Sequence, residues 1–128
     1  MLDASVLVEL LLGSSRSESA VEAISDADLH LPHLADVEVA SVLRGLARVG
    51  TLSSDRAVGA LVDLRDFPAS RWPSIGLFER MWSLRDTVRA YDATYVALSE
   101  ALDATLVTAD AKLARGVAGV ARCPVVTV

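Results

Sequence analysis

The chain has 128 residues, an apolar fraction of 52% and a formal net charge of −5. This composition supplies a hydrophobic core, excludes disordered and collagen-like classes, and argues against a protein that coats nucleic acid with a basic surface. No apolar stretch approaches the ~18 residues of a membrane span, and the single cysteine, Cys123, excludes an internal disulfide and favours a reducing cytoplasm.

The first half of the chain is predicted to contain two short strands and four helices. One strand lies within residues 1–5 and ends around Asp3, and the other spans residues 29–31 and is ended by Pro32. The helices are placed by apolar residues at three- and four-residue spacing, by the breaks at Gly13 and Gly50, and by a capping serine at Ser53 or 54. They are expected over residues 6–12, 17–26, 33–49 and about 54–66.

The second half continues the alternation of strands and helices. Strands are predicted around residues 71–72 and over 104–108 and 125–128, and helices over 75–85, 92–102 and 110–115. Such alternation implies an α/β protein whose parallel sheet is covered on both faces. No repeat, low-complexity tract or linker interrupts residues 1–128, so we expect a single domain.

Four acidic residues occupy special points of this framework. Asp3 ends the first strand, Glu38 lies inside an apolar helix, Asp92 opens a helix, and Asp110 follows the strand that ends near Thr108. In a parallel sheet, ligand sites lie outside the carboxyl ends of the strands, which is where such residues can meet. Singly, Asp92 and Asp110 are also good helix N-caps, and a helix glutamate usually faces solvent.

Gathered carboxylates require compensation. Two of them at ~5 Å repel by about 3 kcal/mol at an effective dielectric near 20, so four need a cation or shared protons. Hard oxygen ligands select Mg²⁺ or Mn²⁺ rather than zinc. The chemistry that suits such a site is metal-assisted hydrolysis of a phosphodiester.

Four segments together resemble a PIN domain, and more narrowly the VapC toxins of bacterial type II toxin–antitoxin systems. Tyr-Asp-Ala-x-Tyr-x-Ala-Leu, which begins at Tyr91, is the most specific of them. The others are Met-Leu-Asp-Ala-Ser at the start, Asp-Val-Glu-Val around Glu38, and Val-Thr-Ala-Asp ending at Asp110. One departure is that only Met1 and Leu2 precede Asp3, whereas most members have a longer first strand.

The resemblance implies a Mg²⁺-dependent endoribonuclease with a three-layer α/β/α fold and a parallel sheet of about four to five strands. It maps the family's acidic quartet, which is catalytic and holds the metal, onto Asp3, Glu38, Asp92 and Asp110. Ser5 and Thr108 match the small hydroxyl positions that support the acids. The resemblance also implies a bacterial homodimer and a cognate VapB-type antitoxin whose tail occupies the toxin groove.

Local arginines are candidate contacts for RNA. Without the acidic quartet the formal charge rises from −5 to −1, so phosphates can be met by single arginines rather than by a basic field. Arg85 and Arg89, four residues apart before Asp92, are candidates, and so are Arg44 and Arg48 on the helix of Glu38. All four equally fit a solvated helix face with partners such as Asp86 or Glu79.

An apolar group at helical spacing precedes Arg85 and Arg89. Its members are Leu77, Phe78, Met81 and Trp82. We interpret Phe78, Met81 and Trp82, together with Trp72, as core rather than as a platform for stacking bases, although this neighbourhood also suits a dimer or antitoxin interface.

Two other functions remain open. A phospho-accepting, receiver-like signalling domain also gathers aspartates at strand ends and needs a lysine, for which Lys112 is the single candidate. A catalytically silent PIN scaffold would bind RNA or a partner protein without cleaving it. The sequence names neither the RNA nor the antitoxin, and it leaves open whether one metal or two are used.

Overall fold

The computed structural model describes all 128 residues and contains seven α-helices, one short 3₁₀ helix and four strands. In chain order these are α1 (Ala4–Leu12), α2 (Ser17–Ile24), β1 (His30–Pro32), α3 (His33–Arg48), α4 (Ser54–Asp66), β2 (Ser70–Trp72), η1 (Ile75–Leu77), α5 (Phe78–Ser83), α6 (Ala90–Ala101), β3 (Leu106–Thr108), α7 (Ala111–Val117) and β4 (Val125–Thr127).

The strands run parallel, and Leu2 joins them into one sheet. β1 pairs with β2, and β3 pairs with β4. Between these pairs, Leu2 forms a parallel bridge with Val107, and its N–H donates to the carbonyl of His30 at 3.0 Å. The spatial order is therefore β2, β1, the segment at Leu2, β3 and β4, which confirms the predicted parallel sheet. The expected first strand is reduced to this bridge, because α1 already begins at Ala4.

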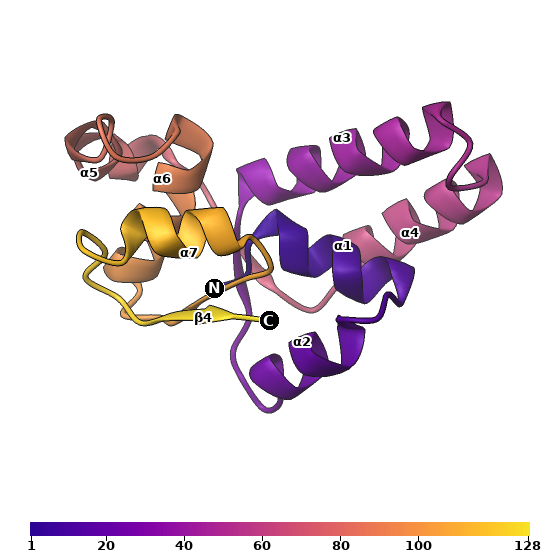
Figure 1. The fold of residues 1–128 in the computed structure, drawn as a ribbon, viewed down its shortest axis with the longest axis horizontal. Coiled ribbons are helices and arrows are strands. Elements are labelled where there is room, and N and C mark those ends of the chain that lie inside the picture. The colour runs from indigo at the N-terminus through magenta and orange to yellow at the C-terminus, as the bar shows by residue number, and fades with distance from the viewer.

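Helices cover both sides of the sheet, as predicted. Figure 1 shows α1 to α4 gathered on one side of the molecule and α5 to α7 on the other. One cluster of 22 buried apolar residues fills the space between them, and Leu2, Leu31 and Leu106 from the central strands are all fully buried within it. The three-layer α/β/α arrangement follows from this distribution. None of the helices has the length and apolar character needed to cross a membrane.

Several helix ends follow the sequence signals closely, although α1 begins two residues earlier than predicted and the helix expected over 75–85 divides into η1 and α5, which ends at Ser83. Gly13 (φ 64°) ends α1 and Gly50 (φ 76°) follows α3, both in the left-handed region that glycine tolerates, and Ser53 caps α4 by accepting from the N–H of Arg56. However, α6 begins at Ala90, so Asp92 lies inside its first turn. The interpretation of Asp92 as an N-cap is therefore wrong.

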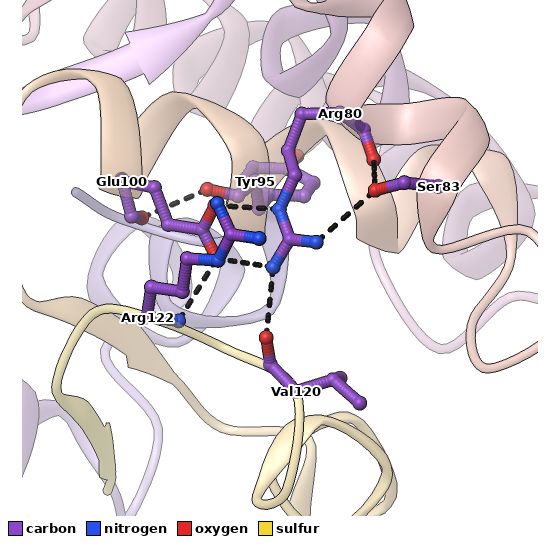
Figure 2. Close-up of polar contacts among 7 residues, drawn as sticks. Arg80, Ser83, Tyr95, Glu100, Val120 and Arg122 are labelled. Atoms are coloured by element: carbon purple, nitrogen blue, oxygen red, sulfur yellow. Dashed lines mark hydrogen bonds and ion pairs between the residues drawn. The ribbon is translucent and has the colours of Figure 1, made fainter.

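An ionic cluster fixes the C-terminal end of α6. Figure 2 shows that Arg80 of α5 donates to both carboxylate oxygens of Glu100, at 2.7 and 2.9 Å, and to the carbonyl of Val120. The N–H of Arg122 donates to Glu100 as well. The hydrogen bonds from Arg80 hold the pKa of Glu100 below its usual range. Since Asp92 lies at the other end of α6, this cluster helps to fix the helix that carries it.

Candidate active site

The four predicted acids come from four different elements next to the centre of the sheet. Asp3 follows the bridge at Leu2 and immediately precedes α1. Glu38 lies in the second turn of α3, Asp92 in the first turn of α6, and Asp110 is the N-cap of α7, directly after β3. Each is thus carried by an element that begins at, or packs near, the carboxyl end of a strand.

Asp3 is a buried carboxylate held by two hydroxyl groups. The residue as a whole is only 8% exposed to solvent. Its Oδ2 accepts from Ser5 Oγ at 2.7 Å and from Thr108 Oγ1 at 2.6 Å. The same hydroxyls accept from the N–H groups of Ala109 and Asp110, at 2.9 and 3.0 Å. Ser5 and Thr108 therefore orient Asp3 and join it to the loop of Asp110, while Asp3 Oδ1 accepts no hydrogen bond.

Glu38 and Asp110 show the same division between their two oxygens. The Tyr95 hydroxyl donates to Glu38 Oε2 at 2.5 Å. Asp110 Oδ1 accepts from the N–H groups of Lys112 and Leu113, at 2.7 and 3.3 Å, as the sequence predicted for an N-cap. In each of these acids, as in Asp3, the protein holds one carboxylate oxygen and leaves the other without a partner.

The acids perturb one another electrostatically. Burial raises the pKa of Glu38, and the charges of Asp3 and Asp92 raise it further, against the opposing effect of the Tyr95 hydrogen bond. Burial likewise raises the pKa of Asp92, with Asp3 and Asp110 adding to the shift and Arg89 opposing it. The site thus carries negative charge that the protein itself does not neutralise.

The acids are neighbours but do not yet enclose a cation. Asp92 and Asp110 line a cavity of about 540 Å³, to which Asp3 and Glu38 do not contribute. Nowhere in the chain are three His, Cys, Asp or Glu side chains arranged as a ready-made cation site.

Three cationic side chains line the same cavity as Asp92 and Asp110: Arg85, Arg89 and Lys112. Arg85 is already engaged, since it forms an ion pair with Asp86 at 3.2 Å and its guanidinium lies 5.2 Å from the ring centre of Trp82. The pairing with Asp86 agrees with the alternative interpretation, in which Arg85 belongs to a solvated helix face. Arg89 and Lys112 form no such ion pair.

An apolar cavity of about 570 Å³ adjoins the polar one and shares Arg85, Val88 and Arg89 with it. Phe78 and Trp82, which line it, are 58% and 69% exposed, and Trp72 of β2 is exposed as well, so the interpretation of these three residues as core is wrong. Leu77 and Met81 do pack against the core. The spacing alone did not reveal that α5 buries only one narrow side.

Comparison with known proteins decides the family. The model of the PIN domain matches residues 1–118. The chain is also 42% identical to a VapC ribonuclease of Mycobacterium bovis over all of its length and 97% of that protein. It belongs to the VapC family of PIN-domain proteins.

Other VapC relatives extend this result. Ribonuclease VapC9 of Mycobacterium tuberculosis is 42% identical over all of this chain and 97% of its own length. Ribonuclease VapC3 of the same species is 40% identical over 90% of this chain and 85% of its own length. Among solved structures, PAE2754 of Pyrobaculum aerophilum superposes with a TM-score of 0.71 at 21% identity, over 97% of this chain and 80% of that one. PIN-domain ribonucleases are in general metal-dependent, and membership of this family replaces the receiver-like alternative.

Sequence reasoning missed Tyr95 as part of the site. The residue stands in the Tyr-Asp-Ala-x-Tyr segment that carries the resemblance, one helical turn after Asp92. That spacing places it near Asp92, and no local pattern relates it to Glu38, which lies 57 residues earlier.

Proposed function

We propose that this protein is a Mg²⁺-dependent endoribonuclease and the toxin of a VapBC system. One observation carries the proposal. In Asp3, Glu38 and Asp110 alike, the protein forms hydrogen bonds to one carboxylate oxygen and leaves the other oxygen without a partner. The relatives that match along nearly their whole length are ribonucleases by name, which supports the same activity.

The donor set fits a hard divalent cation. It consists of carboxylate oxygens alone, the ligands that Mg²⁺ and Mn²⁺ prefer. Burial is the main cause of the raised pKa values of Glu38 and Asp92, and the neighbouring carboxylates, whose charge a cation would neutralise, add to it. When bound, Mg²⁺ supplies a Lewis acid that makes water a nucleophile near neutral pH and stabilises charge on phosphodiester oxygens. The carboxylates have to come closer together than they stand here to share it.

Each acid has a role in this proposal. Asp3 and Asp92 bind the cation directly, and Glu38 and Asp110 complete the site directly or through water. Ser5 and Thr108 donate to Asp3 Oδ2 and so keep Oδ1 available. No histidine or lysine has to act as general base.

Purified protein incubated with total bacterial RNA should cleave it in Mg²⁺ and leave it intact in EDTA. Hydrolysis by water leaves a 5′-phosphate and a 3′-hydroxyl, which mapping of the cut ends identifies. Ends that carry a 2′,3′-cyclic phosphate, or cleavage that persists in EDTA, would contradict the metal mechanism. Binding of RNA without any cleavage in Mg²⁺ or Mn²⁺ would instead support the catalytically silent scaffold.

Arg89 and Lys112 are the residues that we propose for RNA phosphates. Both line the cavity of Asp92 and Asp110, and neither is held by an ion pair. Arg85, the other arginine proposed from the sequence, lies at the same cavity but is occupied by Asp86 and the ring of Trp82. Its contribution to RNA binding should therefore be smaller.

Arg89→Ala should weaken binding of single-stranded RNA, and the slope of log affinity against log salt should fall by about 0.7 for one lost phosphate contact. Fluorescence anisotropy in EDTA, with labelled RNA that stays uncut, measures both quantities. Arg85→Ala is the matched control, in which a smaller change is expected. A larger loss of RNA affinity in Arg85→Ala than in Arg89→Ala would show that Arg85, and not Arg89, is the main phosphate contact.

The remaining proposals concern organisation and partners. We propose that residues 1–128 form a single PIN domain, supported by the one buried cluster that runs from Met1 to Val117. A VapB-type antitoxin is the partner that the family implies. A homodimer is supported by the exposed Phe78 and Trp82, which offer an apolar surface to a second copy. A bacterial cytoplasmic location agrees with an RNA substrate and with the free thiol of Cys123.

A further inference from the structure

Tyr95 links the two helical layers at the active site. Its residue is 1% exposed, so the ring is buried in the core beneath α6, yet its hydroxyl reaches Glu38 Oε2 on α3 at 2.5 Å. α6 and α3 lie on opposite sides of the sheet (Figure 1). The hydrogen bond therefore ties α6 on one side of the sheet to α3 on the other.

Nothing else holds the Glu38 side chain. No other hydrogen bond and no ion pair reaches its carboxylate. Glu38 itself is half-buried on α3, so without this hydrogen bond its carboxylate is free to adopt several rotamers. The buried phenol has few rotamers of its own, because the core packs around its ring.

We propose that Tyr95 is a positioning residue for Glu38 and increases the affinity of the site for its cation. The hydroxyl anchors Oε2, restricts the carboxylate and leaves Oε1 free, as Ser5 and Thr108 do for Asp3. The inference rests on the proposed metal site and adds to it a residue outside the acidic quartet. Outer groups that orient a metal ligand are typically worth 10–100-fold in metal affinity.

Tyr95→Phe removes only the hydroxyl and should weaken Mn²⁺ binding by about tenfold. Binding is measured without RNA, from the electron paramagnetic resonance signal of free Mn²⁺. The matched control is Tyr91→Phe, the only other tyrosine of the chain, which lies on the same helix but is 61% exposed. Its affinity for Mn²⁺ should equal that of the unmodified protein.

A double-mutant cycle separates positioning from general packing. If Tyr95 acts through Glu38, Tyr95→Phe should have no further effect on Mn²⁺ affinity once Glu38→Ala is present. If the hydroxyl only supported the core, the losses of Mn²⁺ affinity caused by Tyr95→Phe and by Glu38→Ala would add in the double variant. Additive losses, or a Tyr95→Phe affinity within twofold of the unmodified protein, would overturn the proposal.

A second measurement needs no change at Tyr95 and so does not depend on the folding of a variant. In the unmodified protein labelled with ¹³C-tyrosine, the Tyr95 Cζ resonance should shift during Mg²⁺ titration, because its acceptor Glu38 becomes a ligand, while that of Tyr91 stays fixed. An unmoved Tyr95 signal in a protein that binds Mg²⁺ and cleaves RNA overturns this inference alone. A protein that neither binds Mn²⁺ nor cleaves RNA overturns the proposed function and this inference with it.

Discussion

Asp92→Asn should lower the rate of RNA cleavage by about 100-fold or more while raising the thermal stability of the cation-free protein near neutral pH. The loss follows from removing a proposed metal ligand and its charge. The gain follows from the raised pKa of Asp92, which burial and the charges of Asp3 and Asp110 cause. Asparagine has nearly the same size but does not ionise, so both effects isolate the charge.

The pH dependence gives the sign of the stability effect. Because the folded state raises the pKa of Asp92, the folded protein holds this proton more tightly than the unfolded chain. The stability that this provides is complete below the ordinary pKa of an aspartate and is lost as the pH rises through the raised value. The advantage of Asp92→Asn in melting temperature should therefore be present at about pH 7 and shrink toward about pH 4.

Calorimetric melting in EDTA, beside the cleavage assay in Mg²⁺, measures the two effects. Glu22→Gln, which changes the charge of an exposed residue on α2, is the control for net charge and should affect neither. Cleavage at the unmodified rate would show that Asp92 is no ligand. A lower melting temperature at about pH 7 would show that its charge favours the fold, for example through the start of α6.

Leu2→Ala should cost about 2–4 kcal/mol of unfolding free energy, because it removes a fully buried side chain at the centre of the sheet and leaves a cavity. Strands β1 and β3 lie on either side of Leu2 and are held to it by backbone hydrogen bonds. These bonds prevent the two strands from moving in to fill the cavity. Urea denaturation followed by circular dichroism measures the loss.

Val37→Ala is the matched control for this truncation. Val37 is 67% exposed on α3, so its replacement should change stability by no more than about 0.5 kcal/mol. Equal losses in the two variants would mean that the Leu2 segment contributes little to the sheet.

Local signals predicted the elements well because their causes are local. The serine cap of α4, the glycines after α1 and α3, and the Asp110 cap of α7 act within a few residues of themselves. The sheet followed from the alternation of elements and the handful of topologies it allows. The family resemblance added the proposed roles of the four acids, which composition and spacing had left open beside N-capping.

Non-local contacts account for what the sequence did not reveal. Phe78 and Trp82 have the spacing of a buried stripe, yet only the packing of α5 against α6 decides which residues reach the core. The start of α6 at Ala90, two residues before the predicted one, depends on the preceding turns. The contact between Tyr95 and Glu38 depends on how two opposite layers meet across the sheet.

The hydrogen bond from Thr108 to Asp3 has a consequence for synthesis of the protein. These residues are 105 positions apart, and the bridge of Leu2 to Val107 spans the same distance. A ribosome therefore releases the first residues long before their partners in the sheet exist, and such long-range pairing is slow to form. A nascent chain has no means of assembling this acidic site until Asp110 has left the ribosome, so the proposed cleavage requires that residues 1–110 have all been synthesised.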